Sequence, residues 1–532
     1  MSSTTAVAAR PEAEPPPAAG DPGRAPALLV VGAALLVTAG LVLRVLTASD
    51  LWLDEALSVN LARLPLADIP GALERDGAPP LYYVLLHVWM AVFGDGDLAV
   101  RSLSGLASAL TIPAVWFAAR RLGGTRAAWG AAVVLAVNPF AIRYGTEARM
   151  YALVALEAAL GLLAALRAYE RPTPRRLALV ALATAVVLYT HYWGIYLVAG
   201  AGLLLLVRAV RQPTPTPAGT WRDRLLGPDG RLLAALAVGA AAWAPWIPTF
   251  LDQAAHTGTP WATPAGPAAL VNVLGEFGGG SSEGARVLTL LLAGLVLLGV
   301  LGRPVEGRLV ELDLKGRPGA RPLFALFLGC PAIAVVLGLV SGTAFVARYT
   351  SVVLPLFAVL AGLGVAAIPD RRRAAALVGA VGLLGLVIAG QGALRNRTQA
   401  GELAGYIAAA AQPGDVVAFC PDQLGPGVLR LLGDRFPTLG FPRAEAPYLI
   451  NWYDYEDVNR TASPAAFAKL VDERAGDAND VWLVSSHGYR TAEKSCTELE
   501  NRLLAVRPFG RQVVRPKPGK YFEDAALIHY PA

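Results

Sequence analysis

Long apolar runs alternate with short polar segments over the first three quarters of the chain. Each run approaches the length of about 20 residues that a helix needs to cross the hydrocarbon core of a bilayer. The runs cover residues 25–46, 98–119, 127–142, 148–168, 176–191, 192–210, 231–250, 285–302, 322–341, 347–368 and 374–391. The pattern therefore predicts a polytopic α-helical membrane protein with about 11 transmembrane helices.

The overall composition agrees with this assignment. Hydrophobic residues make up 55% of the 532 positions, and charged residues make up 16%. Soluble domains carry about 25% charged residues. An ordinary soluble protein is therefore excluded, and the grouping of the apolar residues into long blocks excludes a disordered chain.

The sidedness of the spans depends on one short apolar segment, 81–93. If this segment lies in the membrane interface, every arginine cluster between spans falls on one side, which the positive-inside rule makes cytoplasmic. If it spans, the clusters from Arg120 onward move outside. We therefore expect interfacial helices within a long first external loop, 48–97. The Pro- and Ala-rich segment 1–25 is then predicted to be a disordered cytoplasmic tail.

The chain changes character after the last apolar run. Residues 416–419 and 481–485 have the composition of short buried strands, whereas 428–432 and 496–504 have the pattern of helices. We predict a C-terminal extracytoplasmic α/β domain over 393–532, following a transmembrane domain over 26–392. Cys420 and Cys496 both lie in the α/β domain, and the sequence is equally compatible with a disulfide and with two free buried thiols.

Ionisable and aromatic polar side chains gather at the predicted external edge of the spans. Charged groups this close to hydrocarbon are costly, and they are usually functional or paired. Simpler roles compete at each position: helix caps for the acids, snorkelling for the arginines and an aromatic belt for the Tyr and Trp residues. The candidates come from several separate turns, which is more than topology alone requires. They are Asp54, Glu55, Asp76, Tyr83, Arg101, Arg143, Glu147, Arg149, Tyr151, His191, Tyr192, Trp193, Arg348 and Tyr349.

Acids and arginines at one membrane face suit a particular class of chemistry. A positioned carboxylate can act as a general base on an acceptor hydroxyl. The guanidinium fork of arginine matches the oxygens of a phosphate and stabilises the charge that develops on a leaving phosphate. The pattern therefore indicates glycosyl transfer from a lipid-phosphate sugar.

Five short motifs follow one another in a characteristic order. The first external loop contains WLDEA at 52–56 and DGAPPLYY at 76–83, and Arg101 follows at the start of the next span. EARMY stands at 147–151, and Arg348 precedes Tyr349 late in the membrane part. Over residues 26–392 this order resembles the GT-C superfamily of membrane glycosyltransferases. Within it, the sequence is most similar to the branch of protein O-mannosyltransferases and aminoarabinose transferases, the PMT-like branch.

The resemblance implies a GT-C fold, an inverting transfer and roles for the candidate residues. Asp54 matches the position of the general base, and Glu55 or Asp76 would orient the acceptor. The donor phosphate would be bound by Arg143, Arg149 and Arg348, with Arg101 nearby. The sugar and the acceptor would contact Tyr83, Glu147, Tyr151, His191, Tyr192, Trp193 and Tyr349.

The resemblance leaves the question of a metal open. Some members bind a divalent metal and others do not, and Ala78 stands where the branch has a histidine. The available acids and His191 have no diagnostic spacing for a metal site. No cofactor is therefore assigned, and a divalent metal stays compatible with the sequence.

The expected partners are a polyprenyl-phosphate sugar, membrane lipids and an acceptor in the cell envelope, with no nucleic acid. The acceptor is a glycan, a glycolipid or a protein, and the sugar is a hexose or pentose such as mannose or arabinofuranose. The expected location is the plasma membrane, with the active site outside the cytoplasm. A transporter or flippase of lipid-linked sugars is the alternative, but it would place charges near the middle of the bilayer. A structural membrane protein whose external domain binds partners is a third reading.

Overall fold

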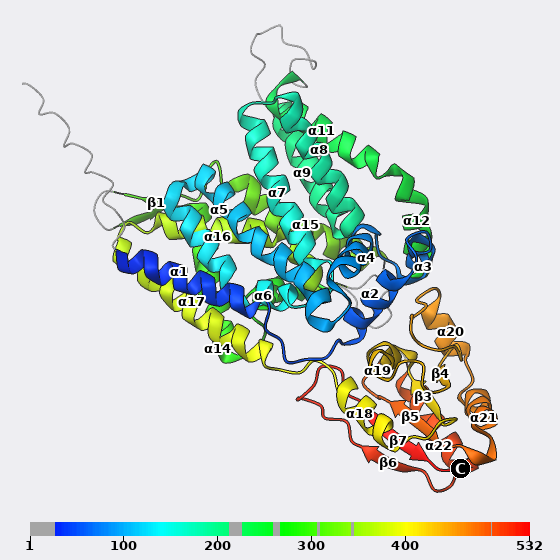
Figure 1. Cartoon of the computed structure of the whole chain (residues 1–532). Coiled ribbons are helices and arrows are strands. Elements are labelled where there is room, and N and C mark those ends of the chain that lie inside the picture. The colour runs from blue at the N-terminus through cyan, green and yellow to red at the C-terminus, as the bar shows by residue number, and fades with distance from the viewer. Residues whose placement is uncertain (1–26, 212–225, 259–265, 306–308, 342–344, 491) are drawn as a thin grey trace, which may run out of the picture.

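The structure, a computed structural model, describes residues 27–211, 226–258, 266–305, 309–341, 345–490 and 492–532. The predicted tail, 1–25, lies outside these residues. Figure 1 shows a helical part, which carries most of the chain, and an α/β part formed by the C-terminal residues. The two parts meet at the end of the helical part that carries helices α2 and α6.

The helical part follows the predicted apolar runs closely. Its helices are α1 (Ala27–Leu43), α2 (Leu53–Arg63), α3 (Ile69–Asp76), α4 (Leu81–Phe93), α5 (Asp97–Ala136), α6 (Pro139–Gly145), α7 (Tyr151–Glu170), α8 (Pro174–Thr190), α9 (Trp193–Arg211), α11 (Pro228–Ala242), α12 (Ile247–His256), α13 (Ala268–Phe277), α14 (Glu283–Leu301), α15 (Arg321–Ser341), α16 (Leu354–Ala367) and α17 (Arg371–Ala393). Two short 3₁₀ segments, η1 (Ala244–Trp246) and η2 (Ala347–Val353), and a small hairpin of β1 (Gly302–Pro304) and β2 (Val310–Leu312) complete it.

The number of spans depends on how broken and short helices are counted. Among the described residues, seven helices are long and apolar enough to cross a membrane, and an eighth results if the bent pair α11 and α12 is one span. Helices α1 and α8 hold only 17 residues each. Helix α5 combines two predicted runs across a break at Gly124, whose φ is 75°. The fold class is confirmed as multi-spanning and helical, whereas the count of eleven stays a prediction.

The first loop folds into three short helices, as predicted for an interfacial segment. Helix α4 covers the same residues, Leu81–Phe93, that topology placed outside the span count. Its buried Tyr82 packs with Leu57 of α2 in a small core of the loop. Ile450 and Trp452 from the α/β part belong to the same core. The loop therefore forms a packed layer between the spans and the C-terminal residues.

Close helix contacts hold the centre of the spans together. Helix α16 is buried over almost all of its length, between α5 and α14. A Cβ atom on Gly299 of α14 would lie 2.1 Å from the Leu360 carbonyl oxygen, and one on Gly364 would lie 1.9 Å from the Leu295 carbonyl oxygen. Only glycine permits this approach of two backbones, a device common between membrane helices. Because η2 leads directly into α16, the residues of η2 are attached to the most fully buried of the candidate spans among the described residues.

The α/β part is built around a five-stranded sheet. Its elements are α18 (Ala400–Ala410), β3 (Val416–Cys420), α19 (Gly425–Leu432), β4 (Thr438–Gly440), α20 (Tyr455–Thr461), α21 (Pro464–Ala475), β5 (Val481–Ser485), α22 (Glu493–Val506), β6 (Arg511–Val514) and β7 (Ala526–Tyr530). The strand order is β4-β3-β5-β7-β6, with β4, β3 and β5 parallel and the other two neighbours antiparallel. The strands predicted at 416–419 and 481–485 are β3 and β5.

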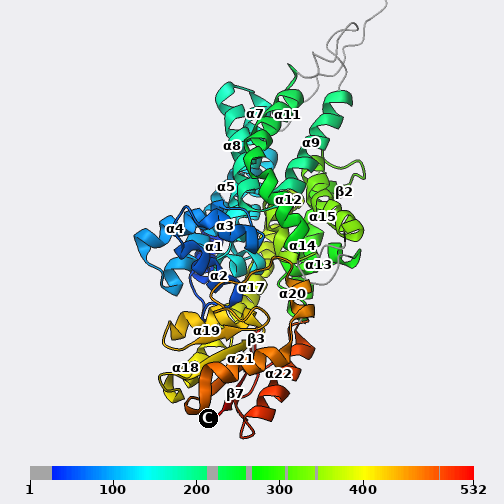
Figure 2. The same cartoon turned by 90° about the vertical axis from the view of Figure 1, so that its right-hand side faces the viewer.

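Helices cover both faces of this sheet, with α18 and α19 on one face and α21 and α22 on the other. Figure 2 shows this α/β part below the helical part. Alternate residues of a strand point to opposite faces. Val416 and Leu483 therefore join a core with α21 and α22, whereas Val417 and Trp482 join a core with α18 and α19. Burial on both faces explains why β3 and β5 are almost continuously apolar.

A disulfide and several polar contacts fix the α/β part. Cys420 at the end of β3 is bonded to Cys496 of α22, which settles the alternative that the sequence left open. Toward the first loop, Arg430 of α19 pairs with Asp97 at 2.8 Å. The Asn60 side chain also donates to the backbone carbonyl of Tyr448 at 2.7 Å. The α/β part is thus attached to the same loop that packs on the spans.

The disulfide leads to a first prediction. We expect denatured, unreduced protein to expose one titratable thiol, that of Cys330, which is buried and free. The double substitution Cys420→Ala and Cys496→Ala should lower the free energy of unfolding by about 2–5 kcal/mol, because it releases a long closed loop in the unfolded chain. Thiol titration and thermal unfolding of the full chain check both statements. Cys330→Ala is the control for the loss of a thiol, and three titratable thiols in the wild type would contradict the bond.

Candidate active site

A cavity of about 690 Å³ lies where the helical part meets the α/β part. Its wall combines α6, η2, the end of α17, the first loop and a C-terminal segment. Arginines, two glutamates and aromatic rings face it together. The lining includes Trp52, Arg143, Tyr144, Glu147, Glu276, Arg348, Arg395, Arg397, Tyr521 and Phe522. An excess of fixed positive charge next to aromatic rings suits an anionic ligand with an apolar portion.

Arg348 in the wall of this cavity pairs with Asp54, which lies behind the wall. Arg348 Nη2 lies 3.2 Å from Asp54 Oδ2, and the two side chains are 13% and 15% exposed. Asp54 stands in the first turn of α2, whereas Arg348 belongs to η2. The guanidinium of Arg348 also lies 5.8 Å from the centre of the Trp52 ring. The pair therefore links the first loop to the buried centre of the spans. Of the two side chains, that of Arg348 lines the cavity.

A second chain of polar contacts runs beside Asp54. Arg149 Nη1 donates to Ser58 Oγ at 3.0 Å and lies 3.5 Å from the phenol oxygen of Tyr83. The phenol of Tyr83 donates to Asp76 Oδ2 at 3.0 Å. Burial raises the pKa of Asp76; Arg149 and the hydrogen bond from Tyr83 oppose this shift, and the charge of Asp54 adds to it. The structure thus brings three predicted residues into one network.

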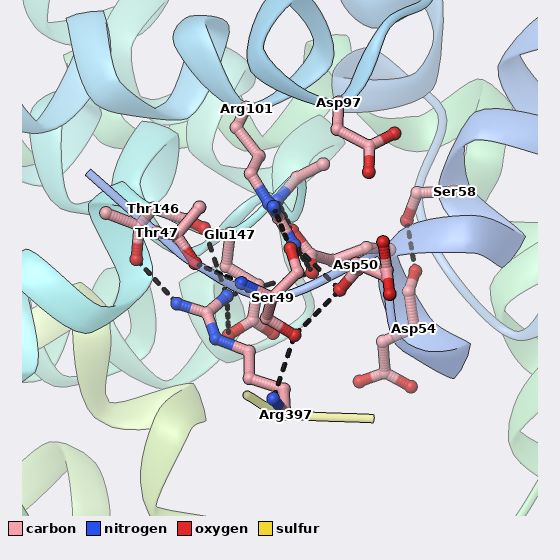
Figure 3. A network of polar contacts seen from close by, with 12 residues as sticks. Thr47, Ser49, Asp50, Asp54, Ser58, Asp97, Arg101, Thr146, Glu147 and Arg397 are labelled. Carbon is pink, nitrogen blue, oxygen red and sulfur yellow. Dashed lines mark hydrogen bonds and ion pairs between the residues drawn. The ribbon is translucent and has the colours of Figure 1, made fainter. Parts of the chain in front are cut away.

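Glu55 and Arg101 form the buried centre of a further network. Figure 3 shows the part of this network around Arg101, Glu147 and Arg397. Arg101 donates from Nε to Glu55 Oε1 at 2.7 Å and from Nη2 to Oε2 at 2.6 Å. Glu55 also accepts the backbone N–H of Ala148 at 2.9 Å, and Arg101 donates to the carbonyls of Ser49 and Asp50. Burial alone would raise the pKa of Glu55, but the charge and hydrogen bonds of Arg101 hold it below its ordinary value.

Arg397, from the linker after α17, joins this network. Its Nη1 donates to the Thr146 carbonyl at 3.0 Å and lies 3.7 Å from Glu55 and 3.9 Å from Glu147. Glu147 also pairs with Arg143 at 3.5 Å. Burial raises the pKa of Glu147 in spite of these two arginines. The linker to the α/β part is therefore held by the same charges as the first loop.

Aromatic rings surround Arg348 on another side. Tyr151 and Tyr349 each lie 5.8 Å from its guanidinium carbon. The rings of His191 and Trp193 lie 5.0 and 6.0 Å from that of Tyr349. Because Nδ1 of His191 accepts the backbone N–H of Trp193 at 3.1 Å, the imidazole is neutral and its ring proton lies on Nε2.

Three buried polar atoms near Asp54 have no hydrogen-bond partner within the described residues. They are Nε1 of Trp52, Nε of Arg149 and the phenol oxygen of Tyr151. Leaving such an atom unsatisfied costs about 1–3 kcal/mol. Their grouping around one ion pair marks a place where a ligand would supply the missing partners.

Of the predicted site residues, Arg143, Glu147 and Arg348 line the cavity. The others, among them Asp54, Tyr151 and His191, are not part of its wall, and three of them are engaged elsewhere. Arg101 is 4% exposed and its guanidinium is occupied by Glu55 and backbone carbonyls, so it is not placed to meet a donor phosphate. Glu55 is fully buried for the same reason. The phenol of Tyr192 contacts Gln253 and accepts a hydrogen bond from Trp246 at 3.0 Å, which directs it toward the α11–α12 region.

Sequence reasoning missed part of the cavity wall. Trp52, Arg395, Arg397, Tyr521 and Phe522 all line it. Arg395 and Arg397 could have been noticed in the sequence. They directly follow the last predicted span on its external side, where the positive-inside rule expects few arginines. The aromatic pair lies over 120 residues further along the chain, and nothing in its local sequence connects it to the spans.

The described residues contain no group of three or more His, Cys, Asp and Glu side chains arranged to hold a metal ion. Two of the acids near the cavity are instead paired with arginines, Asp54 with Arg348 and Glu147 with Arg143. The side chains of the described part of the chain thus do not form a set of ligands for a metal.

Known proteins with a similar sequence or structure show which fold this is. Residues 77–220 match the family described as dolichyl-phosphate-mannose-protein mannosyltransferase. No curated protein matches the chain. Among solved structures, ArnT from Cupriavidus metallidurans is similar in its apo state, with a TM-score of 0.57, 15% identity, and coverage of 94% of this chain and 97% of that chain.

Two ligand-bound structures are similar as well. ArnT bound to undecaprenyl phosphate gives a TM-score of 0.56 at 15% identity, with the same coverage. The archaeal oligosaccharyltransferase AglB from Archaeoglobus fulgidus, in complex with an inhibitory peptide and a dolichol-phosphate, gives 0.51 at 12% identity, covering 94% of this chain and 74% of that chain. The chain therefore has the fold of the GT-C superfamily of membrane glycosyltransferases, and its resemblance to the PMT-like branch is confirmed.

Proposed function

We propose that the chain is a glycosyltransferase that moves a sugar from a polyprenyl-phosphate donor to an acceptor in the cell envelope. The observation that carries this proposal is the Asp54–Arg348 pair, joined at 3.2 Å, with Arg348 in the wall of a cationic cavity. The reaction needs a base for the acceptor and a cation for the leaving phosphate. The pair supplies one group of each kind next to the cavity.

The comparisons support a lipid-phosphate donor. One similar structure is bound to undecaprenyl phosphate and another contains a dolichol-phosphate. In this chain, the cavity offers arginine side chains for the phosphate, beside the apolar residues Ile388 and Ala389 of α17 for the start of the lipid. The sugar is proposed to be a hexose or pentose, with mannose and arabinofuranose as candidates.

In the proposed reaction, Asp54 takes the proton of an acceptor hydroxyl. The hydroxyl oxygen then forms a bond to the anomeric carbon, while the bond from that carbon to the phosphate oxygen breaks. The bonding electrons leave with polyprenyl phosphate, and the configuration of the sugar is inverted. Arg348 and Arg143 would stabilise the negative charge on the departing phosphate.

The remaining candidates would hold the sugar and the acceptor. Tyr151, His191 and Tyr349 form an aromatic and polar surface next to Arg348. A neutral His191 can donate a hydrogen bond from Nε2 to a sugar hydroxyl without adding charge. Asp76 and Tyr83 would orient the acceptor through Arg149, from the side of the first loop.

Glu55 and Arg101 have a different proposed role. Their ion pair is buried and does not line the cavity, so we assign them to holding the first loop rather than to the chemistry. The proposed sidedness places the cavity and the α/β domain outside the cytoplasm, at the plasma membrane. A cell-envelope glycan, a glycolipid or a protein is the corresponding acceptor.

The role of Asp54 yields a direct prediction. In nanodiscs, Asp54→Asn should lower the transfer rate by at least about a hundredfold, because the amide cannot accept the proton of the acceptor. Binding of the donor should persist. We would test polyprenyl-phosphate mannose, glucose and arabinofuranose, with bare polyprenyl phosphate as reference. Asp68→Asn, an exposed acid of the same loop, is the control, and normal turnover by Asp54→Asn would exclude it as the base.

The role of Arg348 is tested by donor affinity. Arg348→Ala should weaken binding of the productive donor by about 10- to 100-fold, since a hydrogen bond to a charged group contributes about 1.5–3 kcal/mol. Binding of bare polyprenyl phosphate should weaken equally if the arginine contacts the phosphate. Arg372→Ala, an exposed arginine at the start of α17, controls for loss of positive charge. Unchanged affinity for both lipids would remove Arg348 from the phosphate site.

Glu55 should behave as a structural residue. Glu55→Gln leaves Arg101 buried without a counter-charge, and breaking a buried pair in this way costs about 3–5 kcal/mol. We expect a lower unfolding temperature and less folded protein, with turnover per folded molecule reduced far less than in Asp54→Asn. Thermal unfolding and active-site-normalised rates separate the two effects. If Glu55→Gln had the unfolding temperature of the wild type but no turnover, Glu55 would have to be a catalytic residue.

A further inference from the structure

A second cavity, of about 580 Å³, lies within the α/β part. Its floor consists of Ala526, Ile528 and Tyr530, alternate residues of β7 on the sheet face that packs against α22, and of Gln512 of β6. One wall is α22, and the other is formed by the segments that follow β5 and β6. Within the described chain, this cavity shares no lining residue with the cavity that holds Arg348.

The second cavity lies where α/β proteins commonly bind ligands. Strand β5 pairs with β3 in parallel and with β7 in the antiparallel direction, so the strand direction changes at this point of the sheet. Residues 486–488, which directly follow β5, line the cavity. Ligands of open α/β sheets bind in crevices outside the carboxyl ends of the strands. Gly510 and Ala526 of the lining have little or no side chain, which leaves room for a ligand beside α22.

Hydrogen bonds hold the central carboxylate of this cavity in place. Glu500 Oε1 accepts the hydroxyl of Ser485 at 2.5 Å and lies 3.0 Å from His487 Nε2. The phenol of Tyr530 donates to the Glu500 carbonyl at 3.2 Å, which joins α22 to β7. The other carboxylate oxygen, Oε2, takes part in none of these contacts, and the side chain is 21% exposed. The protein thus orients the carboxylate and leaves one oxygen available to a ligand.

The charges that line the second cavity disfavour an anionic ligand. Among the described residues, no arginine or lysine lines it, whereas four arginines line the cavity that holds Arg348. Two carboxylates, those of Glu500 and Asp524, line the second cavity instead. A phosphate would meet these negative charges without the guanidinium groups that suit it best. The second cavity is therefore not a further site for the proposed anionic donor.

The remaining lining groups suit a ligand with many hydroxyl groups. Asn501 and Gln512 each offer an amide that can both donate and accept hydrogen bonds, and the carboxylates accept hydrogen bonds from hydroxyls. Leu504 and Ile528 provide apolar contacts among these polar groups. A sugar ring matches this combination, because it carries hydroxyls at its rim and C–H groups on its faces. The volume lies within the range of about 300–1,000 Å³ that is typical of small-molecule sites.

One anchored segment connects the second cavity with the proposed active site. Phe522 lines the cavity that holds Arg348, and Asp524 lines the second cavity. Two positions of an extended chain span at most about 7 Å. The Phe522 N–H donates to the Arg397 carbonyl at 3.0 Å, which holds the segment on the linker after α17. The two cavities are therefore neighbours along this segment.

We propose that the second cavity is a non-catalytic binding site for a neutral oligosaccharide. Glu500 and Gln512 bind hydroxyl groups of the saccharide, and Leu504 and Ile528 contact its C–H faces. The site would hold a cell-envelope glycan next to the cavity of Arg348, which favours a glycan over a glycolipid or a protein as the acceptor. This last step rests on the proposed function, whereas the binding of a saccharide does not.

The test measures saccharide binding to the full-length protein in nanodiscs, since detergents with sugar head groups would compete. Saturation-transfer NMR and titration calorimetry are the readouts. The probes are linear tetrasaccharides of mannose, glucose and arabinofuranose, which are all neutral, and we expect saturable binding of at least one. Tetragalacturonate, an anionic saccharide of the same length, should bind at least about tenfold more weakly, because like charges would face each other.

Two substitutions locate the bound saccharide. Glu500→Ala should weaken binding by about 10- to 100-fold, since it removes a charged hydrogen-bond acceptor. Gln512→Ala changes an exposed position of β6 and should weaken binding by about 2- to 10-fold, the effect of one neutral hydrogen bond. Glu498→Ala is the matched control, because this acid of α22 pairs with Arg502 and does not line the cavity. It should bind the saccharide as the wild type does.

Three outcomes would overturn the proposal. The first is the absence of saturable binding for all three neutral tetrasaccharides, and the second is binding that neither Glu500→Ala nor Gln512→Ala weakens. The third is binding of a glucosamine tetrasaccharide alone, because its amines would make the cavity a cation site. Thermal unfolding shows whether Glu500→Ala is folded, and if it is not, the effect of Gln512→Ala decides.

Failure of the proposed function gives a different result. A wild type that binds a neutral tetrasaccharide through Glu500 but transfers none of the donor sugars contradicts the glycosyltransferase and supports the binding site. A wild type that transfers sugar but binds no neutral tetrasaccharide contradicts the binding site alone. If both hold, Glu500→Ala should raise the KM for a glycan acceptor by about tenfold or more while kcat stays unchanged.

Discussion

The buried charges of Glu55, Arg101 and Arg397 are the constraint on which the rest of the structure depends. Ions are removed from water only when other charges and hydrogen bonds replace its contacts. Here the carboxylate comes from the first loop and the two guanidiniums come from span α5 and from the linker after α17. These segments are brought together at one point, because none of the three charges could stay buried without the others.

This constraint also orients Asp54. Successive residues of an α-helix point about 100° apart. Once Glu55 is directed into the buried network, Asp54 has to leave α2 on another side. That side faces Arg348, at 3.2 Å. Two adjacent acids, which look equivalent in the sequence, therefore have different partners: Glu55 holds the loop through Arg101, and Asp54 pairs with Arg348, which lines the cavity.

The sequence allowed the architecture to be predicted better than the composition of the site. Apolar runs reveal spans because the bilayer imposes a length on each of them, and the arginine clusters identified α4 as a helix outside the span count. The break at Gly124 within α5 was not visible in this way, since both halves are apolar. Local pattern also could not separate Asp54 from Glu55, because only the folded chain shows which carboxylate Arg101 binds.

The residues that close the cavity were hidden for a different reason. Phe522 lies in an irregular segment of the α/β part, and its position next to Trp52 results from the packing of the α/β part on the first loop. Contacts of this kind have no periodicity and no motif. They can be inferred only after the fold shows which surfaces meet.

Arg348 combines these features in a single side chain. Without a donor, its guanidinium is engaged by Asp54 and by the rings of Trp52, Tyr151 and Tyr349. A phosphate entering the cavity would compete with Asp54 for this cation, because both are oxygen anions that match the same fork. In the proposed reaction, a phosphate that takes the guanidinium would leave the Asp54 carboxylate without this partner. The proposed base and the proposed phosphate site thus share one arginine, which cannot be fully engaged by both.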